Sequence, residues 1–182
     1  SSVNIGQTHN RGIDWDMTTR QRLGFGTWTT TLNGTYMLKS DYTRPGTSDQ
    51  WTNSMNYFGT NNAVTFRHIV RLSSSLETGK LSNSLIVNYR NGYTDAAATV
   101  RNLDTGVNVT GFRLEVPSFT TFDWQGRYAF TDAFTLRAGM KNIFDRKPPL
   151  SLRASSGHQV GFDPRYADPL GRQLYVTGNY KF

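Results

Sequence analysis

The final ten residues of the chain alternate between apolar and polar positions without interruption. One side of an extended strand over 173–182 carries Leu174, Val176, Gly178, Tyr180 and Phe182, and the other side carries Gln173, Tyr175, Thr177, Asn179 and Lys181. Because successive side chains of a strand point to opposite faces, this pattern predicts an amphipathic final strand that ends on an aromatic ring.

Six further segments alternate in the same way, at about 2–18, 27–42, 63–75, 81–94, 116–130 and 134–144. The links between consecutive strands are alternately short and long. The short links are Thr19–Gly26, Glu77–Lys80 and Thr131–Ala133, and the long links are 43–62, 95–115 and 145–169. We therefore predict an all-β protein, an antiparallel meander of about seven strands with two chemically different ends. Such asymmetry is typical of transmembrane β-barrels, which have short turns on one side of the membrane and long loops on the other.

The basic residues of the strands lie on one side of the alternation. We predict that this polar face lines a lumen or faces a plug, because an Arg or Lys directed into mid-bilayer lipid costs about 2–4 kcal/mol. The residues concerned are Arg67, Arg71, Arg90, Arg127, Arg137 and Lys141. His68 and Asn142 fall on the apolar side, which indicates either a position near the membrane interface or a slip of register. Aromatic residues near the predicted strand ends fit interfacial girdles: Trp28, Tyr42, Tyr93, Trp124 and Phe182.

Composition narrows the class further. The chain has 182 residues, of which 36% are hydrophobic, 13% aromatic and 18% charged, and it contains no cysteine. No segment has the 3.6-residue period of a long helix, and no apolar run approaches the roughly 20 residues of a spanning helix. The net charge of +7 comes from scattered residues, which does not indicate a nucleic-acid site. A soluble sheet with one face on a core also alternates, so a soluble β-rich module remains an alternative.

Three segments near the C-terminus carry a more specific signal. They are Lys141–Pro149, Phe162–Arg172 and Tyr180–Phe182. In order and spacing they resemble the C-terminal signature of TonB-dependent outer-membrane receptors. Weaker similarity extends upstream through Arg11–Asp14 and Tyr36–Lys39. The motif residues that match are Asn142, Phe144, Asp145, Asp168, Pro169, Gly171, Arg172 and Phe182.

This resemblance implies a barrel of about 22 strands that surrounds an N-terminal plug. We accordingly interpret residues 1–182 as the C-terminal part of one transmembrane β-barrel domain, whose plug and earlier strands lie outside this chain. The implied partners are the outer-membrane lipid, the protein's own plug domain, its remaining strands and, through segments not in this chain, the TonB complex. The implied location is the bacterial outer membrane.

Candidate binding residues come from the loops and from the polar face. Trp51, Tyr57 and Phe58 lie among asparagines in the first long link and either contact a ligand or pack the loop. The polar-face arginines either pair with plug acids or attract an anionic chelate. Three histidines, His9, His68 and His158, lack metal-ligand spacing, and Asp14 with Asp16 forms an acidic pair on one strand face. We predict no metal site, no cofactor and no catalytic residues.

The predicted function is import of a scarce nutrient, a ferric siderophore or other iron chelate, energised through TonB. The alternatives are a passive porin-like channel and a soluble β-rich carbohydrate-binding module.

Overall fold

Long antiparallel strands dominate the computed structural model, which describes residues 6–43, 50–59, 63–152 and 161–182. The main sheet runs, in order, through β1 (Thr8–Leu23), β2 (Gly26–Tyr42), β4 (His68–Thr78), β5 (Leu81–Arg90), β10 (Phe119–Ala129), β11 (Phe134–Lys141) and β12 (Gln173–Tyr180). Every neighbouring pair is antiparallel. The predicted all-β meander is therefore confirmed. Among the described residues, no helix is long and apolar enough to cross a membrane.

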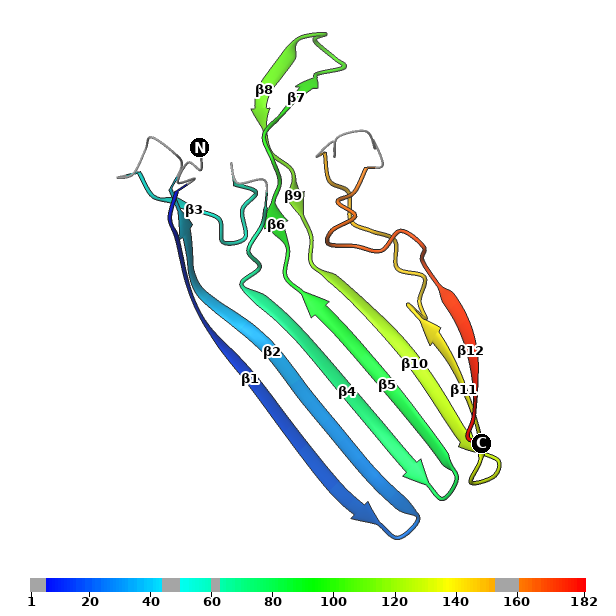
Figure 1. Cartoon of the computed structure of the whole chain (residues 1–182). Coiled ribbons are helices and arrows are strands. Elements are labelled where there is room, and N and C mark those ends of the chain that lie inside the picture. Colours follow the sequence, from blue (N-terminus) through cyan, green and yellow to red (C-terminus); the bar gives the residue numbers. More distant parts are fainter. Residues whose placement is uncertain (1–5, 44–49, 60–62, 153–160) are drawn as a thin grey trace.

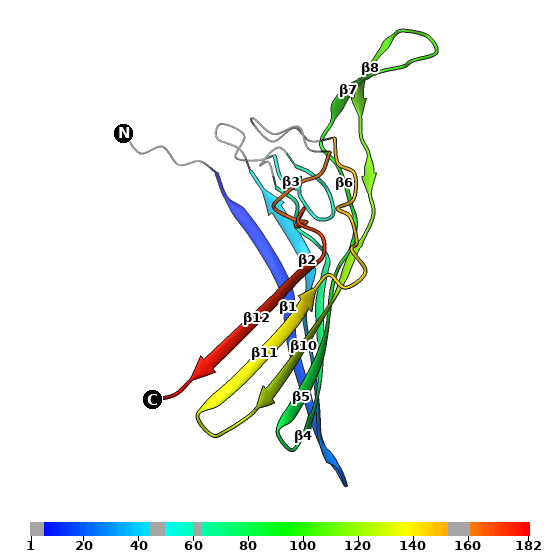
Figure 2. The same ribbon diagram turned by 90° about the vertical axis from the view of Figure 1, so that its right-hand side faces the viewer.

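The sheet is a curved wall with two open edges. β1 pairs only with β2, and β12 pairs only with β11, among the strands of the described chain. Figures 1 and 2 show the strands side by side, with the tight turns at one end and the loops at the other. The C-terminus lies at the end with the tight turns. The fold thus has the two unlike ends that the link lengths predict.

Short strands order the loop end. β3 (Thr52–Asn53) pairs with the end of β2, and β6 (Tyr93–Thr94) pairs with β9 (Glu115–Val116). β7 (Ala98–Arg101) and β8 (Asn108–Phe112) form a separate hairpin that projects beyond the other loops (Figure 1). The predicted long link 95–115 consequently contains short strands of its own.

The predicted first link, Thr19–Gly26, is wrong. The β1–β2 ladder continues to the pair Leu23 and Gly26, which leaves a turn of two residues. Residues 19–22 are polar and give no alternating signal, but a ladder of main-chain hydrogen bonds does not require apolar side chains. The β1–β2 hairpin therefore extends beyond the residues in which apolar and polar positions alternate.

Several strand ends near the loops also differ from prediction. β4 begins at His68 rather than at 63, because Val64 and Phe66 are buried in a cluster beneath the loops. Tyr42 and Tyr93 are only 6% and 4% exposed. Their assignment to an interfacial girdle is wrong, since both rings pack inside the protein.

The last loop begins earlier than predicted. β11 ends at Lys141, and the next residue, Asn142, has a φ of 49°. This left-handed conformation ends the strand, so the alternation of the two faces does not extend to Asn142. His68 does occupy that face, directly opposite Tyr36, with the two ring centroids 4.9 Å apart.

The register gathers the apolar side chains of all seven long strands on one face. Leu32, Leu72, Val87 and Phe122 follow one another across four strands as directly opposed pairs. Many of these side chains have no cover within the chain: Met17 is 57% exposed, Leu174 74% and Val176 71%. An apolar surface of this extent marks contact with another apolar phase.

The opposite face carries hydroxyl, amide and charged side chains in equally consistent register. The Arg71 guanidinium donates to the side-chain oxygen of Asn88 at 3.4 Å, and the side-chain Nδ2 of Asn88 donates to the Asp123 carboxylate at 3.0 Å. These contacts link three strands. Farther along, the Tyr175 hydroxyl donates to Gln125 at 3.0 Å while its ring covers the backbone of Gly139. These contacts make a polar layer that belongs in water or against another polar surface.

The two faces predict opposite responses to a new charge. In the full-length protein refolded into lipid vesicles, Leu72→Arg places a guanidinium on the apolar face near the middle of β4. We expect a loss of about 2–4 kcal/mol of unfolding free energy, measured by denaturant titration. Ser73→Arg is the matched control, because Ser73 lies beside Leu72 on the polar face. Equal losses in the two variants would contradict the assignment of the faces.

Candidate functional site

A small hydrophobic core lies beneath the loops, at the end of the long strands. It consists of Phe58, Val64, Phe66, Tyr93 and Val116, with Ala96 and Tyr166 packed against it. The Phe66 ring meets the Tyr93 ring at 5.7 Å and the Tyr166 ring at 4.9 Å, both edge to face. Burial raises the pKa of Tyr93 to about 12. This aromatic core holds the loops as one unit above the polar face of the sheet.

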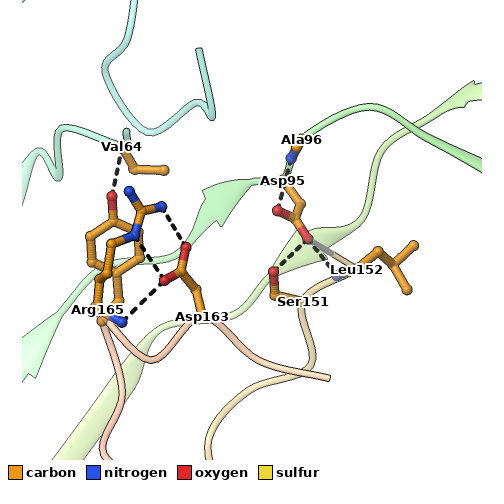
Figure 3. A network of polar contacts seen from close by, with 8 residues as sticks. Val64, Asp95, Ala96, Ser151, Leu152, Asp163 and Arg165 are labelled. Atoms are coloured by element: carbon orange, nitrogen blue, oxygen red, sulfur yellow. Dashed lines mark hydrogen bonds and ion pairs between the residues drawn. The ribbon is translucent and has the colours of Figure 1, made fainter. Parts of the chain in front are cut away.

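A fully buried carboxylate, Asp95, joins two loops (Figure 3). One oxygen accepts from the Ser151 hydroxyl at 2.8 Å and from the Leu152 main-chain N–H at 2.7 Å. The other oxygen accepts from the Ala96 N–H at 2.8 Å. Because a buried charge is tolerated only with such compensation, Asp95 fixes the loop after β11 against the loop after β6.

A second buried carboxylate organises the loop before β12. Asp163 forms an ion pair with Arg165 at 2.6 Å, and it also accepts from the Arg165 N–H and Nε (Figure 3). The Arg165 guanidinium lies 4.9 Å from the centre of the Tyr166 ring. The Tyr166 hydroxyl in turn accepts from the Val64 N–H at 2.9 Å, which ties this loop to the first one.

Arg113 ties the projecting hairpin to the same unit. Its guanidinium donates to the main-chain oxygen of Asp95 at 2.8 Å and lies 4.3 Å from the centre of the Tyr57 ring. The hairpin thus rises from a fixed base.

Below the loops, the polar face is hollowed into a basic chamber of about 480 Å³. Arg90, at the end of β5, is surrounded by the rings of Phe66, Phe119 and Tyr166 at 4.9–5.5 Å. Cation–π contact of this kind holds a guanidinium without neutralising its charge. The chamber is lined by Asn33, Ile69, Val70, Arg71, Asn88, Tyr89, Arg90, Phe119, Thr121 and Tyr166.

A second hollow, of about 420 Å³, adjoins the basic chamber and shares Asn33, Ile69 and Arg71 with it. Its far side carries the acidic pair Asp14 and Asp16 of β1. Asp14 accepts from the Thr35 hydroxyl at 2.6 Å. The acidic pair is therefore part of the polar face, where it lies close to a basic residue as well as to hydroxyl groups.

The three loop residues predicted to bind a ligand, Trp51, Tyr57 and Phe58, differ in their exposure to solvent. Trp51 is 47% exposed, with its ring 6.2 Å from that of His9. Tyr57 is half-buried beneath Arg113. Phe58 is 4% exposed and belongs to the aromatic core, so the alternative of loop packing describes Phe58 better than ligand contact does.

The register places five of the predicted basic residues on the polar face. Arg71, Arg90, Arg127, Arg137 and Lys141 belong to long strands and share that face. Arg67 precedes β4, and its Nε donates to the Met55 sulfur at 3.3 Å.

Arg127 and Arg137 form an unusual pair within this set. They stand directly opposite each other on β10 and β11. Arg137 Nε is buried and has no hydrogen-bond partner among the described residues. Like charges placed opposite each other destabilise a sheet, and no described acidic residue forms an ion pair with either guanidinium.

The C-terminal motif residues build the loop that connects β11 to β12. Asp145 accepts from the Lys147 ammonium and from the Arg172 N–H, both at 2.9 Å, and these two contacts hold its pKa below the usual range. Gly171 has a φ of 66°, and a Cβ there would clash with Asp145. This contact joins the start of the loop to its end and requires a glycine at position 171, whereas Arg172 contributes only its main-chain N–H.

The other motif residues are partly structural and partly exposed. Asp168 accepts from the Leu170 N–H at 2.9 Å and shapes the turn that includes Pro169. Phe144 is 70% exposed, and Phe182 is fully exposed beyond β12 with its ring 5.1 Å from that of Tyr180.

Within the described ranges, no group of three or more His, Cys, Asp and Glu side chains is placed to hold a metal ion. His9 and His68 belong to different strands, and His158 lies outside the described residues. Asp95 and Tyr166 were not predicted from the sequence. Each is a lone polar or aromatic residue in a link, and its role depends on partners that are 56 or more positions away for Asp95 and 102 away for Tyr166.

The role of Asp95 leads to a prediction for the loops. Asp95→Asn keeps the shape of the side chain but replaces one acceptor oxygen by an NH₂ donor, so the three donors cannot all be satisfied. We expect local opening that costs about 1–3 kcal/mol less than before, seen as faster hydrogen exchange at the Leu152 amide. Asp104→Asn, in the exposed turn of the projecting hairpin, is the control. Unchanged exchange at Leu152 would refute the role of Asp95.

Comparison with known proteins agrees with this architecture. A family model described as TonB dependent receptor-like, beta-barrel matches residues 1–143. Among solved structures, the chain is similar to a mutant of the ferric enterobactin receptor PfeA from Pseudomonas aeruginosa, with a TM-score of 0.57 and 18% sequence identity. The match covers 95% of this chain and 22% of that chain; at this identity it shows the fold. No curated protein matches.

The family match covers the strands up to residue 143 and ends before most of the C-terminal motif residues. Receptors of this family are transporters rather than enzymes, and the family implies an outer-membrane location. The apolar and polar faces of the sheet suit the outside and the inside of such a barrel wall. This chain belongs to the TonB-dependent receptor-like β-barrel family.

Proposed function

We propose that the chain forms the C-terminal part of the barrel wall of an outer-membrane receptor that imports a ferric siderophore or another iron chelate. The barrel domain would be completed by strands outside this chain, and a plug would fill its lumen. Transport would be energised through the TonB complex, which acts on segments outside these 182 residues. The similar receptor of known structure is named for a ferric siderophore, which supports the choice of cargo.

The observation that carries the proposal is the unneutralised charge of the polar face. Arg71, Arg90, Arg127 and Arg137 all belong to this face, and none of them forms an ion pair within the described part of the chain. Asp14, Asp16 and Asp123 lie on the same face and offset part of this charge, so the attraction for anions is local to the unpaired guanidiniums. An anionic cargo and an acidic plug surface both fit this wall.

The arginines divide into two groups by position. Arg71 and Arg90 line the basic chamber, directly below the loops, where a ligand from the exterior would arrive first. Exposed loop aromatics, Trp51 and the partly covered Tyr57, would contact the ligand before it reaches the chamber. Planar rings combined with guanidinium groups suit a ligand that has aromatic, negatively charged chelating groups.

Arg127 and Arg137 lie closer to the tight turns, the first near the end of β10 and the second in the first half of β11. We assign them to plug contact, because a barrel wall holds its plug through polar side chains. A plug carboxylate between the two guanidiniums would satisfy Arg137 Nε and remove the repulsion. Lys141, beside Asp123 and Asp168 at the edge of the loops, and Arg67 would extend the contact toward the exterior.

Uptake by the full-length receptor tests the proposed cargo and energy source. In cells that depend on the receptor for iron, Arg71→Gln should raise the half-saturating concentration of an anionic ferric chelate by about tenfold, which corresponds to one lost charge-assisted hydrogen bond. Uptake of a neutral chelate should change little. Arg101→Gln, on the projecting hairpin, is the charge-matched control. Uptake that persists without TonB would instead indicate a passive channel.

The assignment of Arg137 to plug contact predicts whether Arg137→Gln lowers or raises the stability of the receptor. If a plug carboxylate pairs with Arg137, Arg137→Gln should destabilise the full-length receptor by about 1.5–3 kcal/mol. If nothing pairs with it, the same change relieves the repulsion by Arg127 and should stabilise the receptor by about 0.2–1 kcal/mol. Thermal or denaturant unfolding in detergent measures the difference. A stabilised variant would refute the assignment.

A further inference from the structure

We infer that the outward face of the sheet carries a binding site for a phosphate-bearing lipid of the outer leaflet, centred on Arg146. A hollow of about 300 Å³ lies there, and we call it the rim pocket. It is lined by Ser118, Thr120, Phe122, Asn142, Phe144 and Arg146. This inference depends on the membrane placement of the barrel and not on the identity of the imported ligand.

The rim pocket lies on the apolar side of the wall, at the loop end. Thr120 and Phe122 are directly opposite Tyr89 and Val87, which belong to the apolar face. β10 begins at Phe119, directly after the long loop. The pocket is therefore at the level where lipid chains give way to lipid headgroups on the exterior side.

The main chain of Arg146 is held in place by a buried asparagine. Asn142 is 7% exposed; its side-chain oxygen accepts from the Arg146 N–H at 2.9 Å, and its Nδ2 donates to the Arg146 carbonyl at 3.0 Å. The Asn142 N–H donates to Asp123 at 2.8 Å. The main chain of Arg146 is consequently fixed at the edge of the rim pocket.

The charge of Arg146 is not neutralised locally. The neighbouring acid, Asp145, is engaged by Lys147 and by the Arg172 N–H. Arg146 is exposed and forms no ion pair or side-chain hydrogen bond with another described residue. A guanidinium in this state presents paired donors that match the geometry of a phosphate.

The rest of the rim pocket fits an amphiphile. The hydroxyls of Ser118 and Thr120 supply two further donors beside the guanidinium. The Phe144 ring is 70% exposed and packs edge to face on Phe122, with centroids 5.2 Å apart. An acyl chain can lie along these rings and continue down the apolar face. A free phosphate ion would use the donors and leave the exposed rings in water, so the combined surface favours a lipid.

Lipid binding to the full-length receptor tests the inference. The receptor is placed in nanodiscs of a phosphate-free galactolipid, and lipid A is added, either intact or with its phosphates removed. Native mass spectrometry then counts the bound lipid. We expect Arg146→Gln to weaken binding of intact lipid A by about tenfold and to leave binding of the dephosphorylated lipid unchanged. Arg101→Gln, the same charge change on the projecting hairpin, should behave as wild type.

Two results would overturn the inference. The first is equal binding of intact lipid A by the wild type and by Arg146→Gln when both melt at the same temperature. The second is displacement of lipid A from the wild type by millimolar inorganic phosphate, which would indicate a free-anion site. Phe144→Ala should weaken both lipid forms, because it removes the contact with the acyl chains. Uptake of the iron chelate by Arg146→Gln should stay normal, so failure here is distinct from failure of the proposed function.

Discussion

The ladder register of the seven long strands is the constraint on which the rest of the structure depends. Because side chains alternate along a strand, a slip of one residue in any ladder would exchange the apolar and polar faces of that strand. The observed pairs keep Leu32, Leu72 and Val87 in one row and Asn33, Arg71 and Asn88 in the next. A wall with one face for lipid and the other for a polar interior exists only while these rows stay aligned.

A wall of this kind has little core of its own, and the protein compensates at the loop end. The buried hydrophobic residues of the described chain lie mostly in the aromatic core under the loops. Two buried carboxylates then need partners once water is removed: Asp95 joins two loops, and Asp163 organises the loop before β12. A buried charge with several donors defines one arrangement strongly, because any alternative leaves it uncompensated. This explains how long polar links can form a fixed roof over the basic chamber.

The sequence predicts the strands well and the loop architecture poorly, for a physical reason. Alternation is a local property, so the tight turns near Gly79 and Asp132 and the two faces could be predicted from neighbouring residues. It fails where side chains leave the sheet: Val64, Phe66 and Tyr93 alternate as if in strands, yet they pack in the aromatic core. The alternation predicts that the basic residues of the long strands share one face, but nothing in the sequence indicates that Arg127 and Arg137 meet or that Arg90 lies among three rings. These contacts are set by the register of distant strands.

The motif residue Asn142 connects the two sides of the wall. Its main-chain N–H is held by Asp123, which belongs to the polar network of the inner face through Asn88. Its side chain holds the main chain of Arg146 at the outer rim. The left-handed backbone at Asn142 suits an asparagine better than most residues, and it turns the chain from one face to the other. The polar layer and the rim pocket on the opposite face thus both depend on contacts of Asn142, so we expect a change in Asp123 to alter the position of Arg146.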